Sequence, residues 1–280
     1  MGKIIELQIP IPYLEDQPLR NLRIYLPKAY DSKRNQRFPV LYMHDGQNLY
    51  HNKTAYSGVS WGVKQHLQVA ERMGLTDGII VVGIDNGEDL RIFEYSALPF
   101  FDYSTSESSE EYLGLEYADF IVNTLKPLID ENFRTLPDRE HTWMAGSSAG
   151  ANITFFTGLR YPDVFSKLGL FSTALWLFDD EQLNQYVDSC IFDEKGNVPE
   201  SIHSLMAYVY AGTEEGGRHD RFQISQSYLD SAIGILYGFL GRGLSTSQVW
   251  LDIVHGKDHS ERSWRSTFPK FIDFLTNNQE

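Results

Sequence analysis

The chain has 280 residues, of which 42% are hydrophobic and 22% are charged, as expected of a folded globular protein that occupies residues 1–280 as one domain. Its formal net charge of −14 argues against binding to nucleic acid, which needs a basic surface, and against adsorption on an anionic membrane. Cys190 is the one cysteine, so an internal disulfide is excluded. Because the chain has neither a membrane-spanning apolar run nor a signal-peptide core, we expect a cytoplasmic location.

The N-terminal third contains four predicted strands. Residues 4–9 and 22–26 predict an antiparallel hairpin, and residues 39–43 predict the next strand. Residues 78–84 are apolar without polar alternation, which is typical of a parallel strand buried on both faces. Further strands are predicted at residues 142–145, 168–172, 205–211 and 248–254.

Helical patterns separate the later strands. They cover residues 117–132, with a kink expected at Pro127, and residues 152–160 and 223–240. Alternating strands and helices predict an α/β fold whose central sheet is mostly parallel, with helices on both faces and the antiparallel hairpin at its N-terminal end.

Two segments fit no regular element. Residues 96–111 are rich in serine, glutamate and aromatic residues, and residues 175–203 form a long acidic connection. Loops of this length in a compact domain are often lids or binding loops, so we expect lid segments here, with solvated excursions as the alternative.

The sequence Gly146-Ser147-Ser148-Ala149-Gly150 matches the nucleophile elbow of α/β hydrolases. In that elbow a tight turn between a strand and a helix exposes the serine hydroxyl, and small flanking residues avoid collisions. A second match surrounds Ser60, but a polar segment precedes it and the bulky Trp61 follows it. Ser148, which lies between an apolar strand and a helical pattern, is therefore the predicted nucleophile.

Serine needs a base to accept its proton, and in this fold the acid and then the histidine follow the serine along the chain. His259 lies in the loop after the predicted last strand, and His255 is its rival. Glu215 follows the strand at residues 205–211 and is our choice for the acid, with Glu214 and Asp220 as alternatives.

The oxyanion of the reaction needs two backbone N–H donors, and one is predicted to be that of Ala149, directly after the nucleophile. The other is predicted in His44-Asp45-Gly46-Gln47-Asn48, where Gly46 permits a tight turn and the N–H of Gln47 can face the substrate. The aromatic residues Trp61, Tyr95 and Trp176 could line an acyl pocket or pack in the core, and Arg91 could meet an anionic group of the substrate.

Several of these motifs together resemble the putative esterase family of α/β hydrolases, which includes esterase-D-like, enterochelin-esterase-like and feruloyl-esterase-like enzymes. The resemblance runs over roughly residues 20 to 275. It rests on residues 41–49, residues 80–87, Arg91 with Glu94-Tyr95, residues 125–130, residues 133–135, the elbow, and residues 212–215 with His259 and Trp264. It implies Ser148 as nucleophile, His259 as base, Glu215 as acid, and Gln47 and Ala149 as oxyanion donors. Where this family commonly has Gly-Ser-Ser-Met-Gly-Gly, the present chain has Ala149 and Ala151.

The sequence therefore predicts a serine carboxylic-ester hydrolase that acts through an acyl-enzyme on a small or medium ester, without metal or organic cofactor. The substrate is an acyl ester, a feruloyl or acetylated sugar, or a siderophore-type ester. An acyltransferase, a non-catalytic binding module derived from a hydrolase, and a peptidase or thioesterase are the alternatives. The partner we expect is a small-molecule ester, with no nucleic acid and no membrane, and a homodimer is one option that the sequence leaves open.

Overall fold

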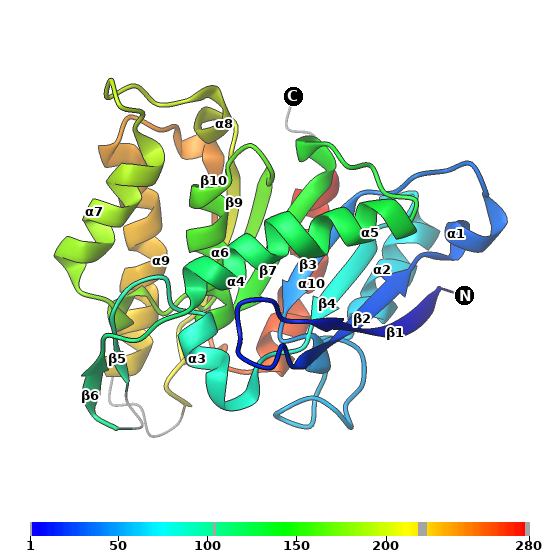
Figure 1. Cartoon of the computed structure of the whole chain (residues 1–280), viewed down its shortest axis with the longest axis horizontal. Helices are drawn as coiled ribbons and strands as arrows, with labels where there is room; N and C mark the ends of the chain where they lie inside the picture. Colours follow the sequence, from blue (N-terminus) through cyan, green and yellow to red (C-terminus); the bar gives the residue numbers. More distant parts are fainter. Residues whose placement is uncertain (1, 103–104, 218–222, 278–280) are drawn as a thin grey trace.

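The computed structural model of the chain describes residues 2–102, 105–217 and 223–277. Within them, eight strands form one sheet in the order β1-β2-β4-β3-β7-β8-β9-β10 (Figure 1). Their bounds are Lys3–Pro10, Leu19–Leu26, Ile80–Ile84, Val40–His44, Thr142–Ser147, Lys167–Phe171, Met206–Gly212 and Val249–Val254 in that order.

The first two strands are antiparallel and the rest of the sheet is parallel. β1 pairs with β2 as a hairpin, and β2 pairs antiparallel with β4. From β4 onward every neighbouring pair is parallel. The predicted mostly parallel sheet with an N-terminal hairpin is therefore confirmed.

Side-chain alternation along the central strands divides the core into two layers. In β3, Val40 and Tyr42 belong to one apolar cluster and Leu41 and Met43 to the other. A strand between two helical layers needs apolar residues on both faces, which explains the unbroken apolar runs in the sequence.

Helices cover both faces, as predicted. The first apolar cluster lies under α4 (Gly114–Phe120), α5 (Lys126–Asn132), α6 (Ala149–Arg160), α7 (Asp180–Ile191) and α9 (Gln223–Gly241), and the second lies under α2 (Val63–Met73) and α10 (Glu261–Thr276). Figure 1 shows α4, α5 and α6 in front of the sheet and α10 behind it. Among the described residues no helix combines the length and apolarity that a bilayer span requires.

The helical pattern at residues 117–132 is interrupted where a kink was predicted. A π-helical turn, Ile121–Leu125, joins α4 to α5 directly before Pro127. Proline has no N–H for the usual bond to the preceding turn, and a wider turn accommodates this loss.

The two predicted lid segments contain regular structure. In residues 96–111, β5 (Phe100–Asp102) pairs with β6 (Glu107–Ser109), and Phe100 also bridges to Phe178 of the second segment. Tyr103 and Ser104 lie outside the described residues. These two segments, far apart in the sequence, therefore meet.

The expectation that residues 175–203 form an irregular connection is wrong, because they contain α7 and α8 (Glu200–His203). Asp179 caps α7 by accepting the backbone N–H groups of Glu181 and Gln182. Val187 and Ile191, four residues apart, are buried on one side of the helix. The acidic residues in the first turn of α7 interact favourably with the positive end of the helix dipole. A segment whose acidic composition suggested a solvated connection therefore forms a helix.

Candidate active site

The loops that leave four parallel strands meet at one edge of the sheet. Ser148 follows β7, Ser172 follows β8, Glu215 lies three residues after β9, and His259 lies in the loop after β10. The carboxyl ends of parallel strands share an edge, and ligands of open α/β sheets bind there.

Ser148 occupies a strained turn between β7 and α6. Its backbone has φ 58° and ψ −129°, a conformation that non-glycine residues rarely adopt. Its N–H donates to the carbonyl of Phe171 at 2.9 Å, which ties the turn to β8. A Cβ atom on Gly146 would lie 2.3 Å from the carbonyl oxygen of Gly150, so the turn requires glycine there.

The imidazole of His259 is paired with Glu215. The His259 Nδ1 atom lies 2.8 Å from Oε2 of Glu215, whose side chain is fully buried. The other oxygen, Oε1, accepts the Ser172 hydroxyl at 2.7 Å and the Gly212 N–H at 2.6 Å. Because the carboxylate engages Nδ1, Nε2 of the same ring is left for a serine proton.

The rival residues lie elsewhere. Glu214 is exposed, and His255 is exposed with its Nδ1 atom 3.4 Å from the Thr213 hydroxyl. Asp220 lies outside the described residues. Of the described candidates it is Glu215 and His259 that the structure brings together.

Two aromatic rings enclose the imidazole of His259. The Tyr228 ring centroid lies 4.6 Å away with the planes inclined by 32°, and Trp264 approaches edge-on at 5.1 Å. The indole N–H of Trp264 donates to the Ser172 hydroxyl at 2.9 Å. Sequence reasoning missed Tyr228 and Ser172, because one lies inside a helical pattern and the other at a strand end, and neither belongs to a motif.

Ser148 and Tyr228 line one cavity. Across residues 2–102, 105–217 and 223–277, no hydrogen bond joins Ser148 to His259. Hydrogen bonds between catalytic groups are often long or poorly aligned in a ligand-free enzyme and tighten when substrate binds. Ser148 and His259 line the same cavity, so both groups face the same space.

The predicted oxyanion donors flank Ser148. Ala149 is the first residue of α6, and the first N–H groups of a helix have no partner within it. Gln47 lies in a turn whose first residue, Asp45, has φ 54°. The side-chain oxygen of Gln47 accepts the N–H of Asn86 at 3.2 Å. Gln47 lines the cavity that contains Ser148.

The helix α3 (Arg91–Glu94) and the next residue, Tyr95, hold the turn before Gln47. Arg91 donates to both carboxylate oxygens of Asp45 at 2.7 Å, and the N–H of Asp45 donates to the Tyr95 hydroxyl at 3.2 Å. Burial would raise the pKa of Asp45, but the guanidinium and its hydrogen bonds outweigh burial and lower it. Glu94 pairs with Arg20 at 2.8 Å, which fixes α3 to β2.

His44 is a buried, neutral residue rather than part of a catalytic pair. Its Nδ1 atom lies 3.1 Å from the Tyr117 hydroxyl, and its ring contacts Tyr95. Burial lowers the pKa of His44 to about 3. The neighbouring Asp45 pairs with Arg91 and not with His44.

Two cavities adjoin Ser148. The first, about 610 Å³, is lined mostly by residues with polar or charged side chains from the loops after β3 and β4, together with Ser148 and His259. The second, about 790 Å³, is lined mainly by apolar and aromatic residues, among them Phe101, Trp176, Leu177 and Tyr228. Ser148 and Arg91 border both cavities, so the predicted nucleophile lies between a polar space and an apolar one.

The predicted substrate contacts divide into two groups. Arg91 and Trp176 line these cavities. Trp61 does not, because it is 2% exposed and stacks on Trp264 at 5.5 Å, behind the site. Tyr95 is fully buried beneath Arg91 and contributes through Asp45. An aromatic residue near a motif can point either into the core or into a cavity, and sequence order does not distinguish the two.

The second match to the elbow motif, around Ser60, lies in a buried loop. The Ser60 hydroxyl donates to the Asn52 side chain at 3.1 Å, and Ser60 is 2% exposed. It is not a site residue. Within the described part of the chain, no three histidine, cysteine or acidic side chains are grouped as metal ligands would be.

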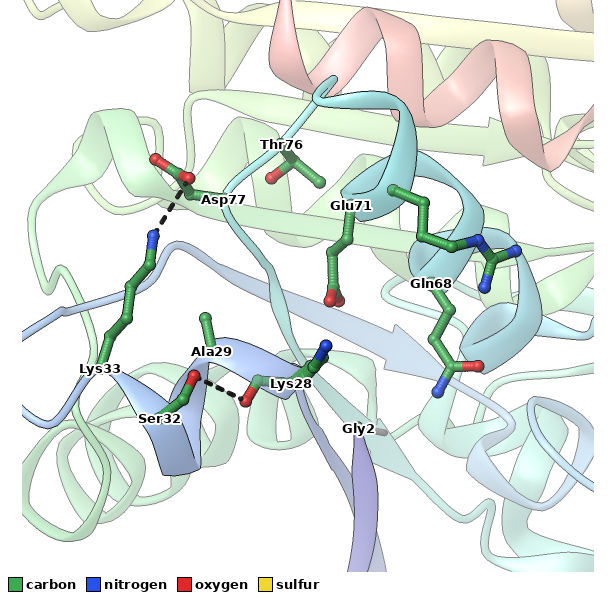
Figure 2. Close-up of a pocket in the computed structure, with 10 residues that line it drawn as sticks. Gly2, Lys28, Ala29, Ser32, Lys33, Gln68, Glu71, Thr76 and Asp77 are labelled. Carbon is green, nitrogen blue, oxygen red and sulfur yellow. Dashed lines mark hydrogen bonds and ion pairs between the residues drawn. The ribbon is translucent and has the colours of Figure 1, made fainter.

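A further cavity of about 510 Å³ lies at the opposite edge of the sheet, between α1 (Lys28–Ser32) and α2. Figure 2 shows its lining side chains, including Lys33, which pairs with Asp77 at 3.6 Å. Glu71 accepts the Tyr25 hydroxyl at 3.0 Å. Of its charged groups, Lys33 and Asp77 form an ion pair, and the residues that line the cavity do not include Ser148.

Comparison with known proteins agrees with this geometry. The "Putative esterase" family model matches residues 17–234. The chain is 24% identical to the uncharacterized protein YbbA of Bacillus subtilis (strain 168), over 91% of this chain and 92% of that one. It is 27% identical to an endo-1,4-beta-xylanase/feruloyl esterase of Xylanibacter ruminicola over 92% of this chain, but it spans only 29% of that protein.

Among solved structures, the siderophore hydrolase EstA of Aspergillus nidulans superimposes with a TM-score of 0.74 at 14% identity, covering 98% of this chain and 95% of that one. At this identity the likeness concerns the fold. The family model covers most of the chain, and the elbow, Glu215 and His259 lie at one edge of the sheet. The chain therefore belongs to the Putative esterase family and is a hydrolase of the serine esterase type.

Proposed function

We propose that the protein hydrolyses carboxylic esters through an acyl-enzyme formed on Ser148. The observation that carries the proposal is the contact of 2.8 Å between the buried carboxylate of Glu215 and His259, at the edge where the strained Ser148 turn lies. In this reaction His259 accepts the serine proton as Ser148 attacks the ester carbonyl, and Glu215 stabilises the charged imidazole. The N–H groups of Gln47 and Ala149 stabilise the oxyanion.

The reaction then proceeds in two balanced halves. Collapse of the tetrahedral intermediate breaks the ester C–O bond, and His259 returns its proton to the leaving alcohol. A water molecule, deprotonated by His259, attacks the acyl-enzyme and releases the acid and the free serine. An alcohol that replaced this water would give acyl transfer, which product analysis with an added alcohol would detect.

The two cavities beside Ser148 support a substrate with unlike ends. Phe101, Trp176 and Leu177 surround the apolar cavity, which suits an acyl group with aromatic or aliphatic bulk. The polar cavity suits a hydrophilic alcohol. The similarity to a xylanase/feruloyl esterase and to a siderophore hydrolase agrees with substrates that join such halves. Arg91, held by Asp45, would contact an anionic or hydroxylated group.

The first prediction tests the nucleophile. Wild-type protein and Ser148→Ala are treated with a fluorophosphonate probe and assayed on acetyl, feruloyl, acetylated-sugar and catechol-siderophore esters. Because only the wild type retains the attacking hydroxyl, we expect labelling of the wild type on Ser148 and a loss of at least about 10³-fold in kcat for the variant. The Ser60→Ala variant serves as the matched control, since Ser60 lies in a buried loop outside the cavities, and it should label normally. Labelling that survives in Ser148→Ala would refute the proposal.

A further inference from the structure

Glu261, the first residue of α10, is a buried acidic residue at the candidate active site. It is 5% exposed, and it lines the polar cavity that also contains Ser148 and His259. Among the described residues, none donates a hydrogen bond to its carboxylate or forms an ion pair with it. A buried carboxylate without a partner is costly, so this side chain is suited to a group that enters the cavity.

The position of Glu261 in its helix does not account for its burial. The helix dipole favours an acidic residue in the first turn, and Asp180 has that position in α7 while it is exposed to solvent. The start of α10 is capped by Ser260, whose hydroxyl accepts the N–H of Ser263 at 3.4 Å. Because Glu261 takes no part in this cap, its place in the cavity lining needs another explanation.

The polar cavity has an excess of negative charge. Apart from His259, the acidic and basic side chains in its lining are Asp45, Glu88, Arg91 and Glu261. Arg91 donates to both carboxylate oxygens of Asp45 at 2.7 Å, so the charges of these two residues offset each other. The carboxylates of Glu88 and Glu261 have no such counterpart among the described lining residues, and Glu261 is the buried one of the two. A cation is the strongest partner for a desolvated carboxylate.

The same cavity is the one that suits the alcohol half of an ester. Ser148 borders both cavities, whereas Glu261 lines the polar one and is not among the described residues that line the apolar one. In the proposed hydrolysis the acyl group occupies the apolar cavity, so a group that contacts Glu261 belongs to the leaving alcohol. A volume of about 610 Å³ accommodates a small amino alcohol.

We propose that Glu261 is a substrate-binding residue that selects esters whose alcohol half carries a protonated amine. The ammonium group donates a hydrogen bond to the Glu261 carboxylate while the ester carbonyl lies at Ser148. The inference rests on the proposed function, since it assigns the two halves of an ester to the two cavities. It gives Glu261 a role in binding and leaves the chemical steps unchanged.

The test uses three acetate esters that differ in their alcohol. Dimethylaminoethyl acetate carries an ammonium group at neutral pH, isoamyl acetate is its uncharged isostere, and glycerol monoacetate carries neutral hydroxyl donors. We expect the wild type to have a higher kcat/KM for the ammonium ester than for the isostere. In Glu261→Gln this ratio should fall about 10- to 100-fold, because a hydrogen bond between charged groups is lost.

The comparison between the two proteins isolates the contribution of the carboxylate. The intrinsic reactivity of each ester is the same for both proteins, so it cancels when the two ratios are compared. Most of the loss should be a higher KM for the ammonium ester, since the contact is made in the bound ester as well as in the transition state.

Asp180→Asn is the matched control, because Asp180 is also acidic and also begins a helix, but it is exposed and lines neither cavity. It should keep the wild-type ratio. Both substitutions remove a charge from a helix N-terminus, so the Tm of Glu261→Gln should fall no further than that of Asp180→Asn. If Glu261→Gln does not fold, Glu261→Asp decides: a lower ratio with the shortened side chain supports the inference, and the wild-type ratio overturns it.

Three results would overturn the inference. The first is a preference for the ammonium ester that survives in Glu261→Gln. The second is a wild type that favours glycerol monoacetate over both other esters, since the cavity would then bind neutral hydroxyl groups. The third is an equal loss of activity on all three esters in Glu261→Gln, which would assign Glu261 a structural role.

Fluorophosphonate labelling separates the inference from the proposed function. If Ser148 of the wild type is not labelled, the proposed function fails. If Ser148 is labelled and the wild type does not favour the ammonium ester, the proposed function stands and the role of Glu261 is rejected. Calorimetric binding of dimethylaminoethyl acetate to Ser148→Ala provides a readout without turnover. Adding Glu261→Gln to that variant should weaken binding about tenfold or more, and equal binding would reject the role.

Discussion

The carboxylate of Glu215 uses both of its oxygens, one for His259 and the other for Ser172 and the Gly212 N–H. A buried carboxylate is costly unless its hydrogen bonds are made, so this network fixes its orientation as well as its charge. The same contacts distinguish Glu215 from its neighbour Glu214, which is exposed. A difference of one position along the chain thus separates a site residue from a solvated one.

For Glu215→Gln we predict a fall in kcat of about 10³- to 10⁴-fold, measured under saturating substrate. The neutral amide does not stabilise an imidazolium, and it can select the tautomer that has its proton on Nε2. Glu214→Gln is the control and should retain wild-type activity. If the two variants exchanged these results, Glu214 would be the acid.

Two buried titratable residues, His44 and Asp45, support the turn that contains Gln47. Asp45 is charged and paired with Arg91, whereas His44 next to it is neutral and enclosed by Tyr95 and Tyr117. The sequence alone shows a His-Asp pair that could be catalytic. Their side chains point to different partners, and together they support the turn that presents Gln47.

At the level of secondary structure, the connection from β7 to α6 is the most constrained element of the site. The strand ends in Ser147, Ser148 takes the strained conformation, and the helix begins at Ala149. The two flanking glycines allow the strand and the helix to approach closely. The geometry of Ser148 therefore requires that Gly146 and Gly150 have no Cβ atom.

We predict that Gly146→Ala lowers the free energy of unfolding by about 3 kcal/mol or more, as urea denaturation would measure. The added Cβ would meet the Gly150 carbonyl oxygen at 2.3 Å, and a backbone atom cannot move aside cheaply. Gly150→Ala should cost only about 1 kcal/mol, because its nearest neighbour is the Asp45 carboxylate at 3.2 Å.

Gly234→Ala is the control for this pair, since its Cβ would meet nothing within 4 Å and it lies inside α9. It should raise stability by about 0.5–1 kcal/mol, because alanine favours a helix over glycine. Equal losses at Gly146 and Gly234 would show that crowding at the elbow is not the cause.

Considered as a whole, the molecule has two cavities of unlike lining beside Ser148. It also buries an uncharged histidine, His44. Burial gives His44 a pKa of about 3 in the folded protein, whereas an unfolded histidine has about 6.5. Between these values the unfolded chain binds a proton that the folded protein does not bind. His44 therefore favours the folded state fully above pH 6.5, and this contribution declines as the pH falls toward 3.

We predict that the free energy of unfolding of the wild type falls more steeply with acid than that of His44→Phe, by about 1.4 kcal/mol per pH unit below pH 6.5. Denaturant titrations at pH 7, 6, 5 and 4.5 would measure the difference in slope. His203→Phe, at an exposed position, should follow the wild type. Parallel wild-type and His44→Phe curves would mean that His44 is protonated in the folded protein.

Sequence patterns were sufficient for the sheet and for much of the candidate site. Apolar runs predicted every parallel strand of the large sheet, because a strand covered by helices on both faces consists mostly of apolar residues. Local context also separated Ser148 from Ser60. The reactivity of Ser148, His259 and Glu215 stays a prediction until it is measured.

Local patterns failed where a side chain's direction decides its role. For Trp61 the sequence left an acyl pocket and the core as alternatives, and the structure places it in the core; Tyr228, inside a helical pattern, was not noticed. Residues 180–191 looked like a solvated loop because their acidic residues concealed the two buried positions that hold α7 in place.

The sequence by itself determined the strands of the large sheet, the elbow and the family, because these depend on the chemistry of neighbouring residues and on regular spacing. Only the tertiary structure decided which carboxylate faces His259, that the Tyr228 ring packs against His259, and that Ser148 borders two cavities of unlike lining. These features join residues that are tens of positions apart, and such contacts arise from the packing of whole elements, which no local pattern encodes.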